Sequence, residues 1–333
     1  MAHTGINKPC PCGSFKPYGE CCRNSETAFF PGGVLKVIDG GLDDSNPPSI
    51  DQMNTILTQF VKEENETPRT EFCGLTSGDI YSLFYRPFDS PHIIEFKIDG
   101  VKIPESPFTE LFYKILKACE GKGMKLTATG NLPRIFCRET AVAYFTADEK
   151  YDDKFIARLI SSEPDFDELH TVNIISKMAG FTRKYKGRLL LSKKGKQVLA
   201  SGLTETDFLS IFRNYTYKFN WAYRDGCADI DFIQTSFLYP LYLLHKFGDN
   251  YRKPSFYEEK FMKAFPLALE EVPQYPYSSQ EKDLRRCFSM RVLERFTSFF
   301  GLTDFKDSTR HFFRKASELK KTAFLDDFIT FHR

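Results

Sequence analysis

The segment GFTRKYKGRLLLSKKGKQVL, residues 180–199, decides the fold because it predicts a β-hairpin followed directly by a helix. Two short strand-like runs flank Lys186-Gly187, a pair suited to the tip of a hairpin. The preceding segment DFDELHTVNIISKMAG, residues 165–180, predicts a helix that ends at Gly180. From Asp165 to Gly202 the chain therefore predicts a helix, a two-stranded hairpin and a second helix.

An earlier segment has a related pattern. Ser106-Pro107 begins a predicted helix that stops at Gly121, MKLTATGNL follows as a strand or turn, and PRIFCRETAVAYF restarts as a helix. The succession of helix, wing and helix in residues 165–202 resembles a winged-helix domain, and its hairpin resembles the wing of many bacterial winged-helix proteins. We expect a tandem or composite pair of such units, with a possible third at 283–331.

Positive charge gathers on the hairpin. Residues 171–202 contain no acidic residue, although the whole chain has a formal net charge of only +2. The basic residues are Lys177, Arg183, Lys184, Lys186, Arg188, Lys193, Lys194 and Lys196. A basic wing is well placed to meet phosphates while the preceding helix meets a groove, with Thr171, Asn173, Ser176 and Lys177 as its base-reading candidates. The alternative is a solvated basic face without a ligand.

Four of the nine cysteines lie in KPCPCGSFKPYGECC, residues 8–22. Disulfides between Cys10 and Cys12 or between Cys21 and Cys22 would be strained, and the start of the chain has no apolar signal segment that would favour an oxidising compartment. Four thiolates form a closed tetrahedral site, the usual structural zinc arrangement. We therefore expect Cys10, Cys12, Cys21 and Cys22 to bind Zn²⁺, with iron as the alternative.

The spacing of these cysteines resembles the SEC-C motif, the small zinc module at the end of the translocation ATPase SecA. The resemblance covers residues 7–23 and implies a module that docks protein or ribosomal partners rather than a catalyst. The body of the chain resembles bacterial proteins that carry this motif at their N-terminus. The other five cysteines are scattered beside apolar residues, which favours free buried thiols.

The fold class that follows is mainly α with small β hairpins. Its expected parts are a zinc knuckle (1–24), a linker or arm (25–50), a small α+β segment (51–104), the tandem winged-helix-like region (105–202), an aromatic-rich helical region (203–280) and a C-terminal helical region (281–333). Two or three domains are usual for 333 residues, since a domain holds roughly 100 to 200 residues. Without a signal segment or a long apolar run, we expect a cytoplasmic protein that does not enter a membrane.

No Walker loop, dinucleotide-binding glycine pattern, GxSxG or HExxH sequence is present. The pairs Asp89/His92 and Asp229/Asp231 are the remaining candidates for a concealed active site. We therefore expect a non-enzymatic protein that binds DNA or RNA through the basic wing and a protein or ribosomal partner through the zinc module. The alternatives are a protein–protein adaptor that does not bind nucleic acid and an enzyme whose site the sequence does not expose.

Overall fold

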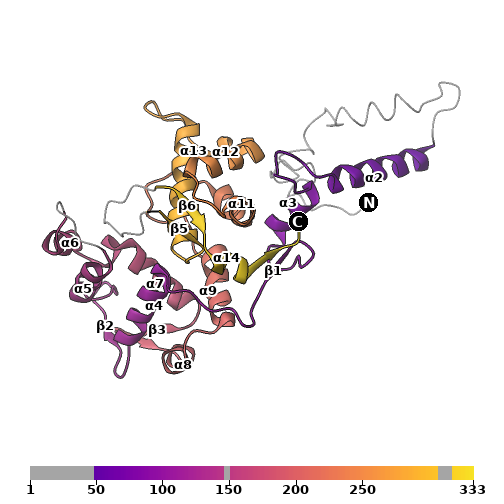
Figure 1. Ribbon diagram of the computed structural model, residues 1–333. Coiled ribbons are helices and arrows are strands. Elements are labelled where there is room, and N and C mark those ends of the chain that lie inside the picture. The colour runs from indigo at the N-terminus through magenta and orange to yellow at the C-terminus, as the bar shows by residue number, and fades with distance from the viewer. Residues whose placement is uncertain (1–48, 146–150, 307–316) are drawn as a thin grey trace. The chain divides into compact units, whose positions relative to one another are not determined.

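The computed structural model describes residues 49–145, 151–306 and 317–333 (Figure 1). The chain divides into two compact units, and in the described residues the first consists of 49–70 and 74–78. This unit contains α2 (Ile50–Glu66), which begins with a reciprocal capping box between Ser49 and Gln52. The second unit holds 71–73 and the described residues from Asp79 onwards.

The second unit is mainly helical with small antiparallel sheets, as the sequence predicts. Its helices up to the hairpin are α3 (Ser77–Tyr85, which begins in the first unit), α4 (Pro107–Ala118), α5 (Arg134–Tyr144), α6 (Asp153–Leu159), the 3₁₀ helix η2 (Glu163–Asp165) and α7 (Asp167–Met178). The later ones are α8 (Lys193–Ser201), α9 (Glu205–Tyr217), α10 (Asp231–Thr235), α11 (Leu238–Phe247), α12 (Pro254–Ala264), the 3₁₀ helix η3 (Pro266–Glu271), α13 (Gln280–Phe288), the π-helix η4 (Ser289–Ser298) and α14 (Ala323–Phe328).

Seven short strands form three antiparallel sheets in the described residues. Strands β2 (Met124–Lys125), β4 (Arg188–Leu191) and β3 (Thr182–Tyr185) form one sheet in the order β2-β4-β3. The other sheets pair β1 (Ile94–Phe96) with β7 (Ile329–Phe331) and β5 (Thr303–Phe305) with β6 (Leu319–Lys321). The two segments expected as a tandem or composite pair therefore share one sheet, because β2 comes from the first segment and β3-β4 from the second.

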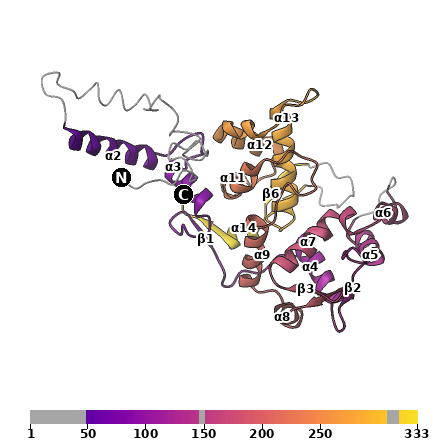
Figure 2. The same ribbon diagram turned by 180° about the vertical axis from the view of Figure 1, so that it is seen from behind.

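Phenylalanine rings form the core of the second unit. Phe212 of α9 lies 5.5 Å from Phe296 of η4 and 5.5 Å from Phe328 of α14, measured between ring centroids. Phe108 of α4 stacks on Phe300 at 4.8 Å. The aromatic residues Phe208, Phe212 and Tyr215 of α9 are buried and belong to this core. Views from both sides place α4–α8 and their small sheet at one end of the unit and α11–α13 at the other (Figures 1 and 2).

The segment around Pro240 forms two helices, because α10 ends at Thr235 and α11 starts at Leu238, so that Pro240 occupies the first turn of α11, where proline is tolerated. Asp152 begins α6, because its side chain accepts a hydrogen bond from the Phe155 amide and caps the helix. No helix in the described residues has both the length and the apolar character needed to cross a membrane.

Helix α7 is fixed by a buried carboxylate. Glu163 of η2 is 1 % exposed; its Oε1 lies 2.7 Å from His170 Nδ1 and accepts a hydrogen bond from Asn173 Nδ2 at 2.6 Å. Its Oε2 accepts a hydrogen bond from the Leu132 amide at 2.5 Å. Burial by itself raises the pKa of the Glu163 carboxyl, but these hydrogen bonds together outweigh it, so the pKa lies below the usual 4.5. One ionised group thus joins α7 to the loop before α5.

We predict that Glu163→Gln lowers the free energy of unfolding at neutral pH by about 2–4 kcal/mol, because the amide nitrogen of Gln would face groups that all donate. The lowered pKa means that the stabilisation from Glu163 is present above pH 4.5 and is lost as the pH falls through the folded-state pKa. Urea unfolding across this pH range should show the difference between the two proteins shrinking as the pH decreases. Glu139→Gln on the exposed side of α5 is the control; an equal loss in both variants would contradict the assignment.

Candidate nucleic-acid interface

The hairpin β3-β4 closes through a two-residue turn. Lys186 and Gly187 have φ values of 44° and 70°, and two positive φ angles in succession are typical of a type I′ turn, whose twist matches that of the strands. Arg188, the first residue of β4, donates from Nη1 to the carbonyl of Gly123 at 2.9 Å and to that of Lys122 at 3.3 Å. This contact holds the hairpin against the chain that leads into β2.

The two faces of the sheet differ in chemistry. Residues directly opposite each other in the register share a face, and alternate residues of a strand point to opposite faces. One face has Leu189 of β4 paired with Met124 of β2, and both are buried. The other face has the row Lys125, Arg188 and Tyr185, with Arg183 two residues away on β3. We call this second, polar face together with the hairpin tip the outer sheet surface.

Tyr185 lies between cations on the outer sheet surface. Its ring is half exposed, with 50 % of its surface accessible. The Arg183 guanidinium lies 5.6 Å from the ring centroid and the Lys186 ammonium 5.4 Å. These cation–π distances keep two charges and one aromatic face together on the solvent side of the hairpin. An exposed aromatic ring flanked by cations suits contact with both a phosphate and a base.

The eight basic residues expected at this site divide into two groups. The exposed group consists of Lys177, Arg183, Lys184, Lys186, Lys193 and Lys196. Arg188 and Lys194 are partly buried. Lys194 lies over the ring of Phe181 at 4.1 Å and pairs with Asp207 at 3.3 Å, so its charge is already engaged within the protein. Desolvation lowers the pKa of the Lys177 ammonium; Glu163 opposes this shift, and the neighbouring charge of Lys184 adds to it.

Sequence reasoning missed the contribution of β2. Lys125 pairs with Arg188 across the sheet, and both Lys122 and Lys125 are exposed. The segment was recognised as a strand or turn, but a two-residue strand has no period from which its partner could be read. The sequence feature that could have indicated a contribution of β2 to the basic surface was the presence of Lys122 and Lys125 shortly after α4.

The expectation that the polar residues of α7 read bases is wrong. Thr171, Asn173 and Ser176 are all buried. Asn173 donates to Glu163, and Ser176 donates to the carbonyl of Val172 at 2.7 Å. Helix α7 packs against both α4 and α9, so these side chains face the protein interior rather than a groove of DNA or RNA.

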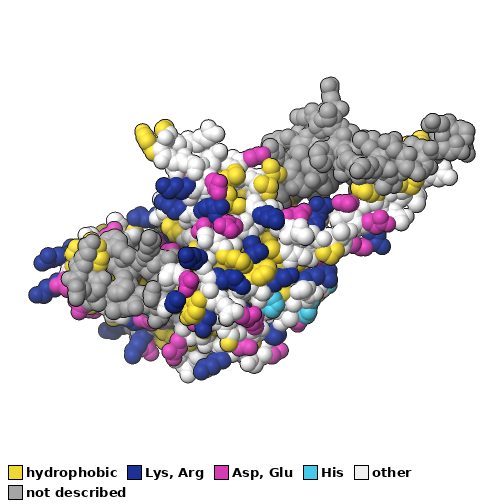
Figure 3. Space-filling model, turned by 45° about the horizontal axis from the view of Figure 1, so that its top comes forward, with side chains coloured by type: hydrophobic (Ala, Val, Ile, Leu, Met, Phe, Trp, Pro, Cys, Tyr) yellow, Lys and Arg dark blue, Asp and Glu magenta, His cyan; other side chains and the backbone are white. Residues whose placement is uncertain are grey.

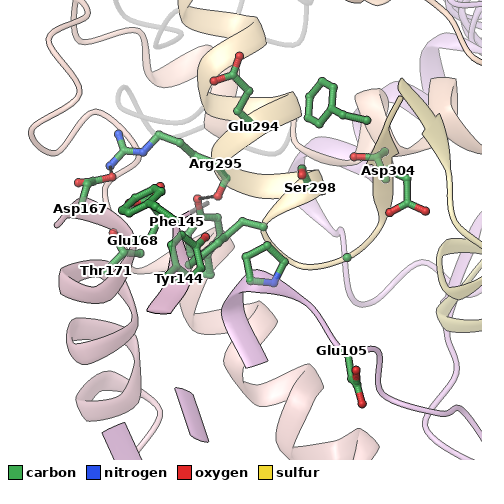
Figure 4. A pocket seen from close by; sticks show the side chains of 16 residues that line it. Glu105, Tyr144, Phe145, Asp167, Glu168, Thr171, Glu294, Arg295, Ser298 and Asp304 are labelled. Atoms are coloured by element: carbon green, nitrogen blue, oxygen red, sulfur yellow. Dashed lines mark hydrogen bonds and ion pairs between the residues drawn. The ribbon is translucent and has the colours of Figure 1, made fainter. Parts of the chain in front are cut away.

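A cavity of about 360 Å³ lies away from the hairpin (Figure 4). Its walls come from the start of α7, the end of α5, η4 and β5, and its charged lining residues are Glu105, Asp167, Glu168, Glu294, Arg295 and Asp304. Figure 4 shows the Arg295 guanidinium turned toward Asp167, with which it forms a 2.5 Å hydrogen bond. The described residues that line the cavity include no His, Cys or Lys.

The pairs considered for a concealed active site lie elsewhere. Asp89, His92, Asp229 and Asp231 are all exposed, and none of them lines this cavity. Figure 3 shows basic and acidic side chains interspersed over the described surface on the face in view.

The comparisons with known proteins bear on the same region. Residues 105–204 match the Y4jL N-terminal domain family. The match runs from the residue before the Ser106 cap to the start of α9, and therefore includes the whole β2-β4-β3 sheet. No curated protein and no solved structure matches the chain.

The expected SEC-C resemblance is wrong, because the family comparison finds the Y4jL domain at 105–204 and no SEC-C module at 7–23. Among the described residues no group of three or more His, Cys, Asp or Glu side chains is placed to hold a metal ion. Cys10, Cys12, Cys21 and Cys22 lie outside the described residues, so their metal binding stays a prediction from the chemistry of clustered thiols.

We predict that protein purified without chelator contains about one zinc ion per chain, and that Cys10→Ser/Cys12→Ser loses it because two thiolates rarely hold zinc alone. Plasma emission spectrometry that measures zinc and iron together distinguishes the two metals. The matched control is Cys119→Ser/Cys137→Ser, which changes two buried cysteines of the second unit. Metal-free wild-type protein, or equal metal in both variants, would contradict the prediction.

Proposed function

We propose that the chain binds nucleic acid non-enzymatically through the outer sheet surface, by contacts with phosphates rather than by reading bases. The observation that carries the proposal is the gathering of Lys125, Arg183, Lys186 and Tyr185 on one solvent-facing side of the sheet. Cations in such an array displace the counterions of a phosphate backbone, which supplies affinity without sequence preference.

The topology supports this proposal. Helix α4, strand β2, helices α5 and α7 and hairpin β3-β4 follow one another in the order of a winged helix, with the first strand paired to the last. We interpret residues 105–202 as one composite winged-helix unit with α6 and η2 inserted before α7. In this interpretation the wing makes the contact, because the polar residues of the helix before it are buried.

The exposed tyrosine extends the proposal to single strands. Stacking of a base on an aromatic ring contributes about 1–3 kcal/mol and tolerates any base. Tyr185 is the exposed ring on the outer sheet surface, and Arg183 and Lys186 lie beside it to meet the flanking phosphates. Both a duplex and a single strand therefore belong in the binding test.

A second candidate is a protein–protein adaptor, because the polar residues of α7 that could have contacted bases are buried. A basic, aromatic-centred sheet surface suits an acidic protein segment as well as a phosphate backbone. The two candidates differ in their ligand: nucleic acid should bind at low salt in the first case and should not bind in the second.

We predict that Arg183→Gln/Lys186→Gln weakens binding to a fluorescent random-sequence duplex of 20 base pairs and to the matching single strand. Each lost phosphate contact lowers the slope of log K against log salt by about 0.9, so the double variant should lower it by about 2 for the duplex. Fluorescence anisotropy between low and moderate salt gives the slopes. Both side chains are exposed, so the fold should be retained.

Lys263→Gln/Lys282→Gln is the matched control, since both lysines are exposed on α12 and α13 and the change in net charge is the same. This variant should bind nearly as the wild-type protein does. Equal weakening in both variants would mean that net charge rather than the outer sheet surface governs binding. Absence of binding by the wild-type protein at low salt would overturn the nucleic-acid proposal in favour of the adaptor.

A further inference from the structure

The cavity of Figure 4 lies between elements that come from separate parts of the second unit's chain. Helix α7 contributes Asp167, Glu168 and Thr171 to its walls, and η4 contributes Glu294 and Ser298, which lie about one turn apart. The end of α5 and strand β5 form further walls. The volume of about 360 Å³ lies within the range of roughly 300 to 1,000 Å³ that is usual for sites of small molecules.

One wall of the cavity is a π-helix. Such helices are rare, are mostly a single turn long and occur frequently at functional sites, whereas η4 extends over ten residues, Ser289–Ser298. Arg295 of η4 forms ion pairs with Asp167, 2.5 Å from Nη2, and with Asp225, 3.9 Å from Nη1. The cation that Arg295 contributes to the described lining is therefore already engaged, and carboxylates remain in excess there.

Two carboxylates of the lining are available to a ligand. Glu105 and Asp304 are exposed, and neither forms an ion pair or a side-chain hydrogen bond with another described residue. Lys320 lies opposite Asp304 in the register of β5 and β6, but its ammonium is 5.0 Å from the centroid of the Tyr251 ring. A cation in the cavity can therefore pair with these carboxylates without displacing a charge of the described chain.

A buried hydroxyl at the cavity also has no partner. Thr171 is 5 % exposed and lines the cavity, and its side chain forms no hydrogen bond with any other described residue. Buried polar groups are nearly always hydrogen-bonded, because leaving one unpaired costs free energy. Ser298, on the η4 wall, likewise forms no side-chain hydrogen bond within the described part of the chain. Both hydroxyls can accept a hydrogen bond from a ligand that carries N–H groups.

The carboxylates are spread around the cavity. Figure 4 shows Asp167 and Glu168 on one side and Glu105 and Asp304 on the other. Within the ranges that the structure describes, no three His, Cys, Asp or Glu side chains are placed to hold one metal ion. Aromatic rings at the ends of α5 and η4 and in β5 also line the cavity, and such rings attract ammonium groups and pack on alkyl chains. This lining fits an elongated organic cation better than a metal ion.

We propose that the cavity binds an aliphatic polyamine, a small cation whose ammonium groups are separated by short alkyl chains. Ammonium groups at the two ends pair with the carboxylates on the two sides, an N–H donates to the Thr171 hydroxyl, and the alkyl chain contacts the aromatic rings. A lysine side chain of a protein partner carries the same chemistry. The free polyamine is the better fit, because one lysine has a single ammonium group and cannot pair with both sides.

This inference goes beyond the proposed binding of nucleic acid and does not depend on it, since no residue of the outer sheet surface lines the cavity. The test is isothermal titration calorimetry of the full-length protein, freed of nucleic acid, with spermidine at an ionic strength of about 0.15 M, where weak surface contacts are screened. We expect one spermidine per chain and weaker binding of putrescine, which has one ammonium group fewer. Mg²⁺ should not compete.

Two variants locate the binding. Glu105→Gln/Asp304→Asn should weaken spermidine binding about tenfold, because it removes two ionic contacts. Thr171→Val, which keeps the shape of the side chain, should weaken it about threefold through the lost hydrogen bond. The matched control is Glu259→Gln/Asp327→Asn, which changes net charge equally at exposed positions outside the cavity and should bind as the wild-type protein does. Circular dichroism verifies folding, and the exposed pair still decides the test if Thr171→Val unfolds.

The proposal is overturned if spermidine does not bind the wild-type protein, or if both double variants weaken binding equally, which would show that net charge alone attracts the polyamine. Competition by Mg²⁺ would assign the cavity to a metal ion. Tighter binding of an acetylated trilysine amide than of spermidine would assign it to a lysine-bearing protein partner. Spermidine binding that is lost in Glu105→Gln/Asp304→Asn and retained in the control would establish the site.

Discussion

The burial of helix α7 is the constraint on which this end of the second unit depends. The helix packs between α4 and α9, and the amide of Phe181 donates to the carbonyl of Ser176 at 2.8 Å, so that β3 starts from a fixed point. Helix α8 returns close to the same point, because a Cβ at Gly195 would lie 2.3 Å from the carbonyl oxygen of Phe181. The hairpin is therefore rigid at its base and exposed at its tip, which places its cations on a fixed surface rather than on a mobile arm.

Local signals made much of this arrangement predictable. Ser106 and Thr109 form the capping box that begins α4, Gly180 ends α7 with a positive φ, and Lys186-Gly187 make the hairpin turn. Each of these signals acts within a few residues and needs no knowledge of the rest of the fold. The basic outer sheet surface follows from them for the same reason, since alternation along β3 places Arg183 and Tyr185 on one face.

Long-range partners could not be predicted from the sequence. Three polar residues on α7 suggested a solvent-facing helix, yet Asn173 is buried because Glu163, ten residues earlier, supplies an ionised acceptor. The pairing of Lys125 with Arg188 joins strands more than sixty residues apart, and β2 is too short to show a period. The SEC-C resemblance of the N-terminal cysteines failed for a related reason, because it rested on about a twentieth of the chain. In so short a segment, the spacing of cysteines indicates which metal ligands are present rather than which family the chain belongs to.

The arginines of the second unit show why exposure rather than number decides which charges can act on a ligand. Arg291 is buried, forms an ion pair with Asp225 and donates to two carbonyl groups, and Arg295 forms an ion pair with Asp167. Removing Arg291 would leave the buried carboxylate of Asp225 without its main partner, at a cost of about 3–5 kcal/mol. Arg183 and Lys186 differ from these two arginines, because their contacts with the Tyr185 ring leave their charges on the solvent side. A phosphate can therefore bind the hairpin cations with little rearrangement, while Arg291 stays bound to Asp225 and the carbonyl groups of Ala228 and Ile230.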